Sequence, residues 1–444
     1  MIDLLWLILA IVLIVVLIVK VKLHPAVSLI IGTLLLGIVA GLTLTDVATT
    51  TTTGFGDLMM GIGLSVGFGI ILGQLMSDSG GAAIIARSLI SLTSERFALY
   101  GLAFAAFVLS IPVFYDVTFV ILIPLAVAIA RQINKPLPFA VGVVALGAGT
   151  SHTLVPPTPN PLAAGEILGF DTGYMIAVGG TVGLLATFGA VFVYSRVLAK
   201  VWNPATDVEA EPVYDSTQGE RKNPPPFFLA ILPILVPVLL ILMGTTFQAI
   251  KGSVPTVVAF FGDKTVAMLL GVLVAYLVAW RNMSRQEMET SSNEAVQSAG
   301  VVLLITGAGG SFGAMIQAVG IDQVIVELVS SLGGSHLVVL LACWLVGAAF
   351  RLAVGSGTVA SITTMTIMAS VAPTIGVHPV WVAIACLGGA LSLGHINDSG
   401  FWVTAKIPGF TVSGGLKTYT LPQLTASVFI LVLALIGSTL LPLS

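Results

Sequence analysis

Four side chains that can do chemistry stand close together near the end of an apolar C-terminal half. They are His395, Asn397, Asp398 and Ser399, within the run Gly394-His395-Ile396-Asn397-Asp398-Ser399-Gly400-Phe401-Trp402. The residues just before this run, 380–393, carry no charge. Polar groups in apolar surroundings cost several kcal/mol of free energy unless they have a role. The cluster therefore indicates a protein that handles a polar solute inside a membrane.

Each member of this cluster has a distinct chemical capacity. His395 and Asp398 are three residues apart, so a helix would place them on one face. Both titrate, which makes them candidates for carrying a proton. Asn397 and Ser399 can hydrogen-bond the hydroxyls of a substrate. The alternative is a network of hydrogen bonds that only holds a broken helix, and a zinc site is not indicated because no third ligand is near.

Arg351 follows an apolar helix and precedes the loop Gly355-Ser356-Gly357-Thr358. A guanidinium binds a carboxylate through two parallel hydrogen bonds. Glycines let backbone amides face an anion, and the start of a helix favours negative charge. We therefore predict an anion site made by Arg351, Ser356 and Thr358. The alternative is an arginine that extends from a helix end to lipid head groups.

A proline-rich break in the first half supplies a matching set of polar groups. Thr150-Ser151-His152-Thr153 is followed by Pro156-Pro157-Thr158-Pro159-Asn160-Pro161, which cannot continue a helix. Ser151, Thr158 and Asn160 are candidates for contact with a substrate, and His152 for contact with the substrate or the proton. The alternative is a loop at the membrane surface.

Two carboxylates stand in apolar or glycine-rich stretches. Asp116 follows Pro112 and Tyr115, and a buried carboxylate in a membrane usually has a function. It is a candidate to pair with Arg351 or to carry the proton. Asp78, in Ser77-Asp78-Ser79-Gly80, is expected at the tip of a hairpin and is a further proton candidate.

The composition shows which elements must position these groups. The chain is 57% hydrophobic and only 8% charged, against roughly 25% charged in average soluble domains. Its apolar stretches are continuous and long enough to span a bilayer, which predicts an all-α polytopic membrane protein and argues against a β-barrel. Its 48 glycines and 22 prolines predict broken helices, which are typical of a transporter or a channel. The net charge of −3 gives no sign of nucleic-acid binding, and no motif indicates a cofactor or a metal.

Matching features recur at a shift of about 240 residues. Gly73 and Gly80 align with Gly313 and Gly320, and residues 116–118 align with 356–358. We predict two repeats of inverted orientation, 1–200 and 227–444, joined by a charged cytoplasmic linker at 201–226. Paired interruptions are typical of secondary transporters that bind substrate near the membrane midplane. Segments 57–90 and 297–330 are expected to be re-entrant hairpins, and the run Thr49–Thr53 a polar loop.

These residues resemble the gluconate permease (GntP) family, a branch of the ion transporter superfamily. The resemblance rests on residues 75–82, 112–116, 151–161, 306–310, 351–360 and 394–402. It implies proton-coupled uptake of gluconate or a related hydroxy acid across a bacterial inner membrane. It also implies hairpins and broken helices in two repeats, a homodimer and an elevator-type movement. One departure is Gln317-Ala318-Val319-Gly320, which stands where other members tend to carry Asp-Ser-Gly.

We therefore expect a secondary active importer of a small hydroxylated monocarboxylate, and not an enzyme. The nearest alternative is a sodium-coupled carboxylate carrier of the same architecture, in which Asn160, Asn397 and freed carbonyls hold the ion. A channel would conduct downhill without saturating. An intramembrane enzyme using His395 and Asp398 is the most distant alternative, because no nucleophile motif or metal triad accompanies them.

Overall fold

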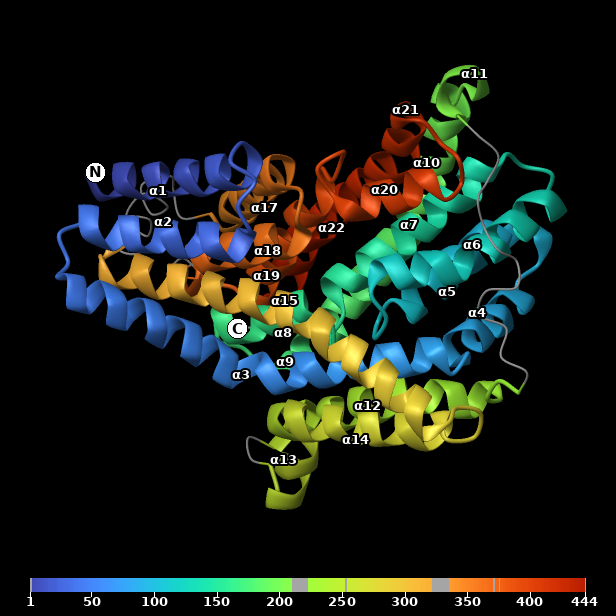
Figure 1. The fold of residues 1–444 in the computed structure, drawn as a ribbon, viewed down its shortest axis with the longest axis horizontal. Helices are drawn as coiled ribbons and strands as arrows, with labels where there is room; N and C mark the ends of the chain where they lie inside the picture. The colour runs from blue at the N-terminus through green and yellow to red at the C-terminus, as the bar shows by residue number, and fades with distance from the viewer. Residues whose placement is uncertain are drawn as a thin grey trace.

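The computed structural model describes residues 2–209, 223–251, 254–321, 335–369, 372–374 and 376–443. Within these residues the ordered elements are helices, and the one β-type pairing is an isolated bridge between Val208 and Phe410 (Figure 1). Eight described helical segments are long and apolar enough to cross a membrane, and a pair bent by 62° adds a ninth if it forms one span. The all-α polytopic membrane fold predicted from composition is confirmed.

The first half of the chain contains eleven described helices. They are α1 (Ile2–Val19), α2 (Pro25–Val39), α3 (Leu44–Asp78), α4 (Gly81–Ser91), α5 (Ala98–Leu109), α6 (Tyr115–Gln132), α7 (Leu137–Leu154), α8 (Pro159–Leu168), α9 (Thr172–Tyr174), α10 (Gly180–Val201) and α11 (Pro204–Asp207). A π-helical turn, Met175–Gly179, joins α9 to α10.

The described helices of the second half follow a similar order. They are α12 (Phe227–Lys251), α13 (Thr256–Gly262), α14 (Lys264–Ala279), α15 (Arg285–Ala318), α17 (His336–Val354), α18 (Gly357–Met368), α19 (Pro379–Ser392), α20 (Ser399–Lys406), α21 (Val412–Gly415) and α22 (Leu421–Leu440). A second π-helical turn, Leu416–Thr420, precedes α22 as the first precedes α10. The bent pair is α13–α14.

The long helices α3 and α15 lie side by side (Figure 1). Gly54 and Gly310 face each other there: a Cβ built on either would lie 2.7 Å or less from the carbonyl oxygen of the other. Small residues permit this close backbone approach between membrane helices. Each helix ends at a glycine with positive φ, Gly80 at 78° and Gly320 at 72°. The two helices are therefore in close backbone contact, and each leads into a turn at a glycine.

Two details of these segments differ from expectation. The run Thr49–Thr53 is not a loop but part of α3, because Thr43 caps the helix by accepting the Asp46 amide at 3.1 Å. The Thr51 hydroxyl inside the helix donates to the Val47 carbonyl at 2.7 Å. Segment 57–90 is thus the second part of a long helix, a turn at Ser79–Gly80, and α4. The corresponding second arm of segment 297–330 lies outside the described residues beyond Ile321.

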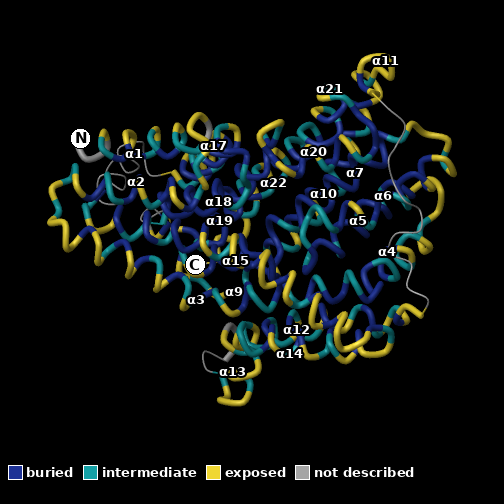
Figure 2. Tube along the Cα trace, viewed as in Figure 1, coloured by how far each residue is buried: buried dark blue, intermediate teal, exposed yellow. Residues whose placement is uncertain are grey.

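Helices α7 and α19 occupy the most buried part of the fold (Figure 2). Residues 380–392 of α19 are all buried, and α7 is buried over nearly its whole length. Helices that are apolar on every side are expected in such positions. Each is followed by a break and a short helix, α8 or α20, so two interrupted helices cross the centre of the protein.

The start of the predicted linker is packed against the second half. Asp207, at the end of α11, is fully buried and accepts hydrogen bonds from Lys417 at 2.8 and 2.7 Å and from Ser413 at 2.7 Å. The bridge between Val208 and Phe410 continues this contact. Residues 203–209 therefore bind the connection between α20 and α22 before the chain enters 210–222, which lies outside the described residues.

Candidate functional site

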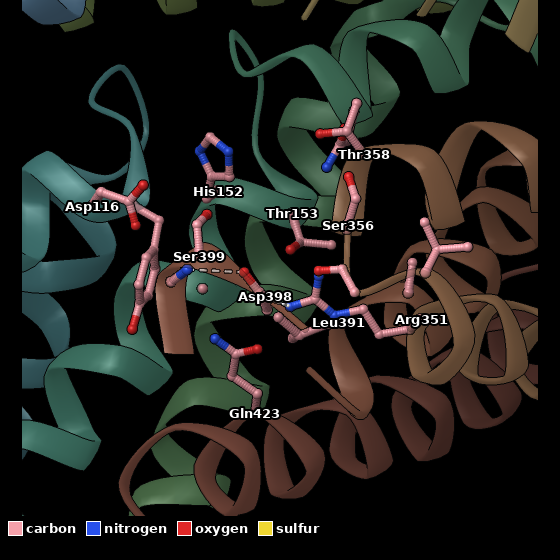
Figure 3. A pocket seen from close by; sticks show the side chains of 18 of the residues that line it. Asp116, His152, Thr153, Arg351, Ser356, Thr358, Leu391, Asp398, Ser399 and Gln423 are labelled. Atoms are coloured by element: carbon pink, nitrogen blue, oxygen red, sulfur yellow. Dashed lines mark hydrogen bonds and ion pairs between the residues drawn. The ribbon is translucent and has the colours of Figure 1, made fainter. Parts of the chain in front are cut away.

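Four interruptions of the helices meet at one cavity of about 460 Å³ (Figure 3). They are the breaks between α5 and α6, α7 and α8, α17 and α18, and α19 and α20. Two breaks come from each half of the chain. A cavity of this size suits a small organic ligand. The predicted site residues that line it are Asp116, His152, Asn160, Arg351, Ser356, Thr358, Asn397, Asp398 and Ser399.

Arg351 and Asp398 form a buried ion pair at the centre of the site. The Arg351 Nη2 donates to Asp398 Oδ2 and, at 3.1 Å, to the Tyr419 hydroxyl. Tyr419 in turn donates to the same carboxylate oxygen at 2.5 Å, and the Gly400 amide donates to the other oxygen at 2.9 Å. The Arg351 Nη1 donates to the Gly355 carbonyl at 2.9 Å. The guanidinium is thus fixed on two sides.

One donor of this guanidinium has no hydrogen-bond partner in the protein. The Arg351 Nε is buried and has no hydrogen-bond partner. A buried donor without a partner costs about 1–3 kcal/mol, so such groups usually have a ligand or a functional reason. Because Arg351 itself lines the cavity, it is a candidate to bind an anionic ligand there.

The loop after α17 needs a glycine at its first position. Gly355 has a φ of 76°, and a Cβ on it would lie 2.4 Å from the carbonyl oxygen of Asn397. Ser356 caps α18, because its hydroxyl accepts the Val359 amide at 3.3 Å. Thr358 follows in the first turn and lines the cavity. The loop therefore brings the two breaks of the second half into contact.

His395 and Asn397 hold the end of α17. His395 donates its Nε2–H to the Leu352 carbonyl at 3.0 Å, and the Asn397 amide donates to the same carbonyl at 3.0 Å. The last carbonyls of a helix need such partners from outside the helix. His395 does not line the cavity, whereas Asn397 does. Such contacts agree with the alternative interpretation of the 394–402 run, in which its hydrogen bonds hold a broken helix together.

The break between α7 and α8 contributes buried polar atoms without partners. His152 and Asn160 line the cavity, and their Nδ1 and Oδ1 atoms are buried without a hydrogen bond. Ser151 Oγ is also unpartnered but is fully buried away from the cavity lining. Thr158 donates to the Val155 carbonyl at 2.8 Å across the break and does not line the cavity.

Two predicted proton carriers lie in different places. Asp116, in the first turn of α6, lines the cavity on the side opposite Arg351, with Asp398 between them in the view of Figure 3. Asp78 is the last residue of α3, accepts from Gln74 at 3.1 Å and is not part of the cavity. Within the described residues no group of three His, Cys, Asp or Glu side chains could hold a metal ion.

Sequence reasoning missed two residues of the site, Tyr419 and Gln423. Both line the cavity and are buried. They stand four residues apart, so a helix carries them on one face. Several other polar residues surround them in 416–427, so no distinct signal in the sequence marks them.

The profile of the GntP family permeases matches residues 2–440. The chain belongs to the GntP permease family. It is 33% identical over 438 residues to a gluconate permease of Pseudomonas aeruginosa, covering 95% of each chain. It is 31% identical to the inner membrane permease YgbN of Escherichia coli, covering 91% of each chain. The protein is thus a multi-pass permease of the inner membrane.

A solved structure shares the fold. The YdaH transporter of Alcanivorax borkumensis superposes with a TM-score of 0.67 at 17% identity, covering 95% of this chain and 100% of that chain. At this identity the similarity describes the fold alone. The resemblance to the GntP family seen in the sequence is confirmed by the match over the whole chain.

Proposed function

We propose that this permease imports gluconate or a closely related hydroxylated monocarboxylate together with a proton. One observation carries the proposal: Arg351, His152 and Asn160 line one cavity, and each keeps a buried polar atom (Nε, Nδ1 and Oδ1) without a partner in the protein. A ligand with one carboxylate and several hydroxyls satisfies both kinds of group. The gluconate permease of P. aeruginosa is similar over nearly the whole chain, which supports the same substrate class here.

The carboxylate of the substrate binds at Arg351. Its Nε–H has no partner in the protein, while Nη2 is shared by Asp398 and Tyr419. The backbone start of α18 at Ser356 and Gly357 lies beside it and adds the favourable end of a helix for an anion. The proposal thus keeps the anion site predicted for Arg351, Ser356 and Thr358.

The hydroxyls of the substrate bind around the rest of the cavity. Asn160 offers an amide oxygen without a partner, and Thr358 and Ser399 offer hydroxyls. Asn397 contributes through the end of its amide that does not hold α17. Ser151 and Thr158 shape the break behind this wall instead of touching the substrate.

Charge counting supports coupling to a proton. The cavity contains one permanent cation, Arg351, and two carboxylates, Asp116 and Asp398, while His152 and the hydroxyls can be neutral. A substrate carboxylate makes three negative charges against one positive charge. Charges in such a poorly screened site interact strongly, so one carboxylate takes up a proton when the substrate binds. Asp398 is the better placed, because its protonation also releases Arg351 for the substrate.

The proposal also covers the repeats of the chain and the movement that carries the substrate across the membrane. The similar order of helices in the two halves, and the contribution of two breaks from each, support inverted repeats around a shared site. We infer an elevator-type movement of the site relative to the α3–α15 pair. The exposed apolar faces of α12 and α14, with Leu239, Leu273 and Leu277, provide surface for a homodimer or for lipid.

Uptake of labelled gluconate into proteoliposomes tests the function. We expect an inward proton gradient to accelerate uptake, and replacement of sodium by choline to leave it unchanged. Uptake that needs sodium would instead identify a sodium-coupled carrier, and uptake that ignores the gradient would refute proton coupling. Absence of gluconate uptake would refute the substrate. R131K, an arginine substitution at the exposed end of α6, is the matched control for R351K, which should abolish uptake.

A further inference from the structure

We propose that Gln423 determines specificity by recognising the hydroxyl next to the carboxylate of the substrate, at C2. The proposal rests on the proposed function and goes beyond it, because it assigns one residue to one group of the ligand. It predicts that the permease prefers 2-hydroxy acids over otherwise identical acids that lack this hydroxyl.

The position of Gln423 is that of a ligand contact. It lies in the first turn of α22, is only 2% exposed, and still lines the cavity. Its Oε1 is buried and has no hydrogen-bond partner. Figure 3 shows its amide turned toward Asp398, from the side of the cavity opposite His152. The Oε1 end of the amide is therefore the end for which the protein supplies no partner.

The neighbours of Gln423 show which part of the ligand it reaches. Tyr419, one helical turn earlier on the same face, accepts from Arg351 Nη2 at 3.1 Å. Gln423 therefore lies one turn from a residue that contacts Arg351, the residue assigned to the substrate carboxylate. The hydroxyl nearest to a carboxylate in a hydroxy acid is the one on C2. A hydroxyl can both donate and accept, so it satisfies the amide in either orientation.

The other side of Gln423 is closed. A Cβ built on Gly149 would lie only 3.1 Å from Gln423 Nε2, so α7 packs directly against the amide. The side chain of Tyr419 also hydrogen-bonds Gln423. These contacts hold the amide in place and leave its Oε1 without a protein partner.

Competition with labelled gluconate uptake tests the inference, with unlabelled gluconate and 2-deoxygluconate as the two competitors. A buried polar group left without its partner weakens binding about 10- to 100-fold. We expect the wild-type permease to bind 2-deoxygluconate more weakly by that factor. Q423M should weaken gluconate by a similar factor and leave 2-deoxygluconate unchanged. Q132M, at the exposed end of α6, should change neither.

The outcomes separate this inference from the proposed function. Equal loss of both ligands in Q423M would show that Gln423 only packs the site and would overturn the inference, as would no loss of either. Equal binding of the two ligands by the wild type would overturn it without any variant, even if Q423M fails to fold. Failure of the wild type to bind gluconate at all would refute the proposed function instead.

Discussion

The Arg351–Asp398 pair allows a sharp test of the site's electrostatics. Arg351 is 5% exposed and Asp398 is 9% exposed. In R351Q the Asp398 carboxylate keeps only the Tyr419 hydroxyl and the Gly400 amide as partners. In D398N the buried guanidinium loses its counter-charge. Breaking a buried pair by removing one partner costs about 3–5 kcal/mol, so we expect each variant to lose that much unfolding free energy.

The double variant R351Q/D398N should lose no more than either single variant. It removes both charges, so no uncompensated charge stays buried, whereas independent effects would add to about 6–10 kcal/mol. Unfolding in detergent, followed by the fluorescence of the six tryptophans, measures the four free energies. The exposed pair Lys406–Glu209 is the matched control, and the cycle of K406Q with E209Q should show a coupling of only about 0–1 kcal/mol.

Transport gives the second readout of the same variants. D398N cannot exchange a proton at this position, so its uptake of gluconate should be slow and independent of the proton gradient. R351Q and R351Q/D398N should show no uptake, although the double variant should be no less stable to unfolding than either single variant. Additive losses of stability would show that the pair does not form in the membrane. Uptake by the double variant would refute the assignment of Arg351 to the carboxylate.

Two further predictions concern the backbone around the site and the start of the linker. G355A should lose about 1–2 kcal/mol of unfolding free energy because alanine is strained in the left-handed conformation of this position. It should also lose uptake, because the new Cβ would meet the Asn397 carbonyl. G41A is the control: Gly41 also has a positive φ but has open space around it, so unfolding and uptake assays should show the backbone effect alone. Burial alone would raise the pKa of Asp207, but hydrogen bonds from Lys417 and its neighbours lower it overall. Its stabilising effect is therefore complete above pH 4 and is lost as the pH falls toward the lowered pKa. D207N should be less stable than the wild type at pH 7 by about 1–3 kcal/mol in detergent unfolding, and the gap should close in acid; a constant gap would contradict the assignment.

Much of the site could be predicted because its residue types are costly in a membrane. Arg351, Asp116 and Asp398 are charged residues in apolar segments, and such residues are seldom retained without a role. Gly355 and the prolines of 156–161 mark breaks, because neither residue type continues a helix well. These are local properties of the chain, and they need no knowledge of the packing.

The partners of these residues could not be predicted. The sequence offers Asp116 as a partner for Arg351, whereas in the fold Asp398 forms that pair and His395 donates to the end of α17. Tyr419 and Gln423 were missed because a tyrosine and a glutamine in an apolar span are unremarkable until the fold turns them toward the cavity.

The sequence by itself determined that this protein is a helical membrane permease with interrupted spans, because hydropathy, glycine and proline act on each segment separately. Only the tertiary structure decided that residues of four distant breaks share one cavity, and which of them compete for the same guanidinium. Hydrogen bonds and ion pairs depend on distances of a few ångströms between segments, and such distances are set by the packing of all the helices together.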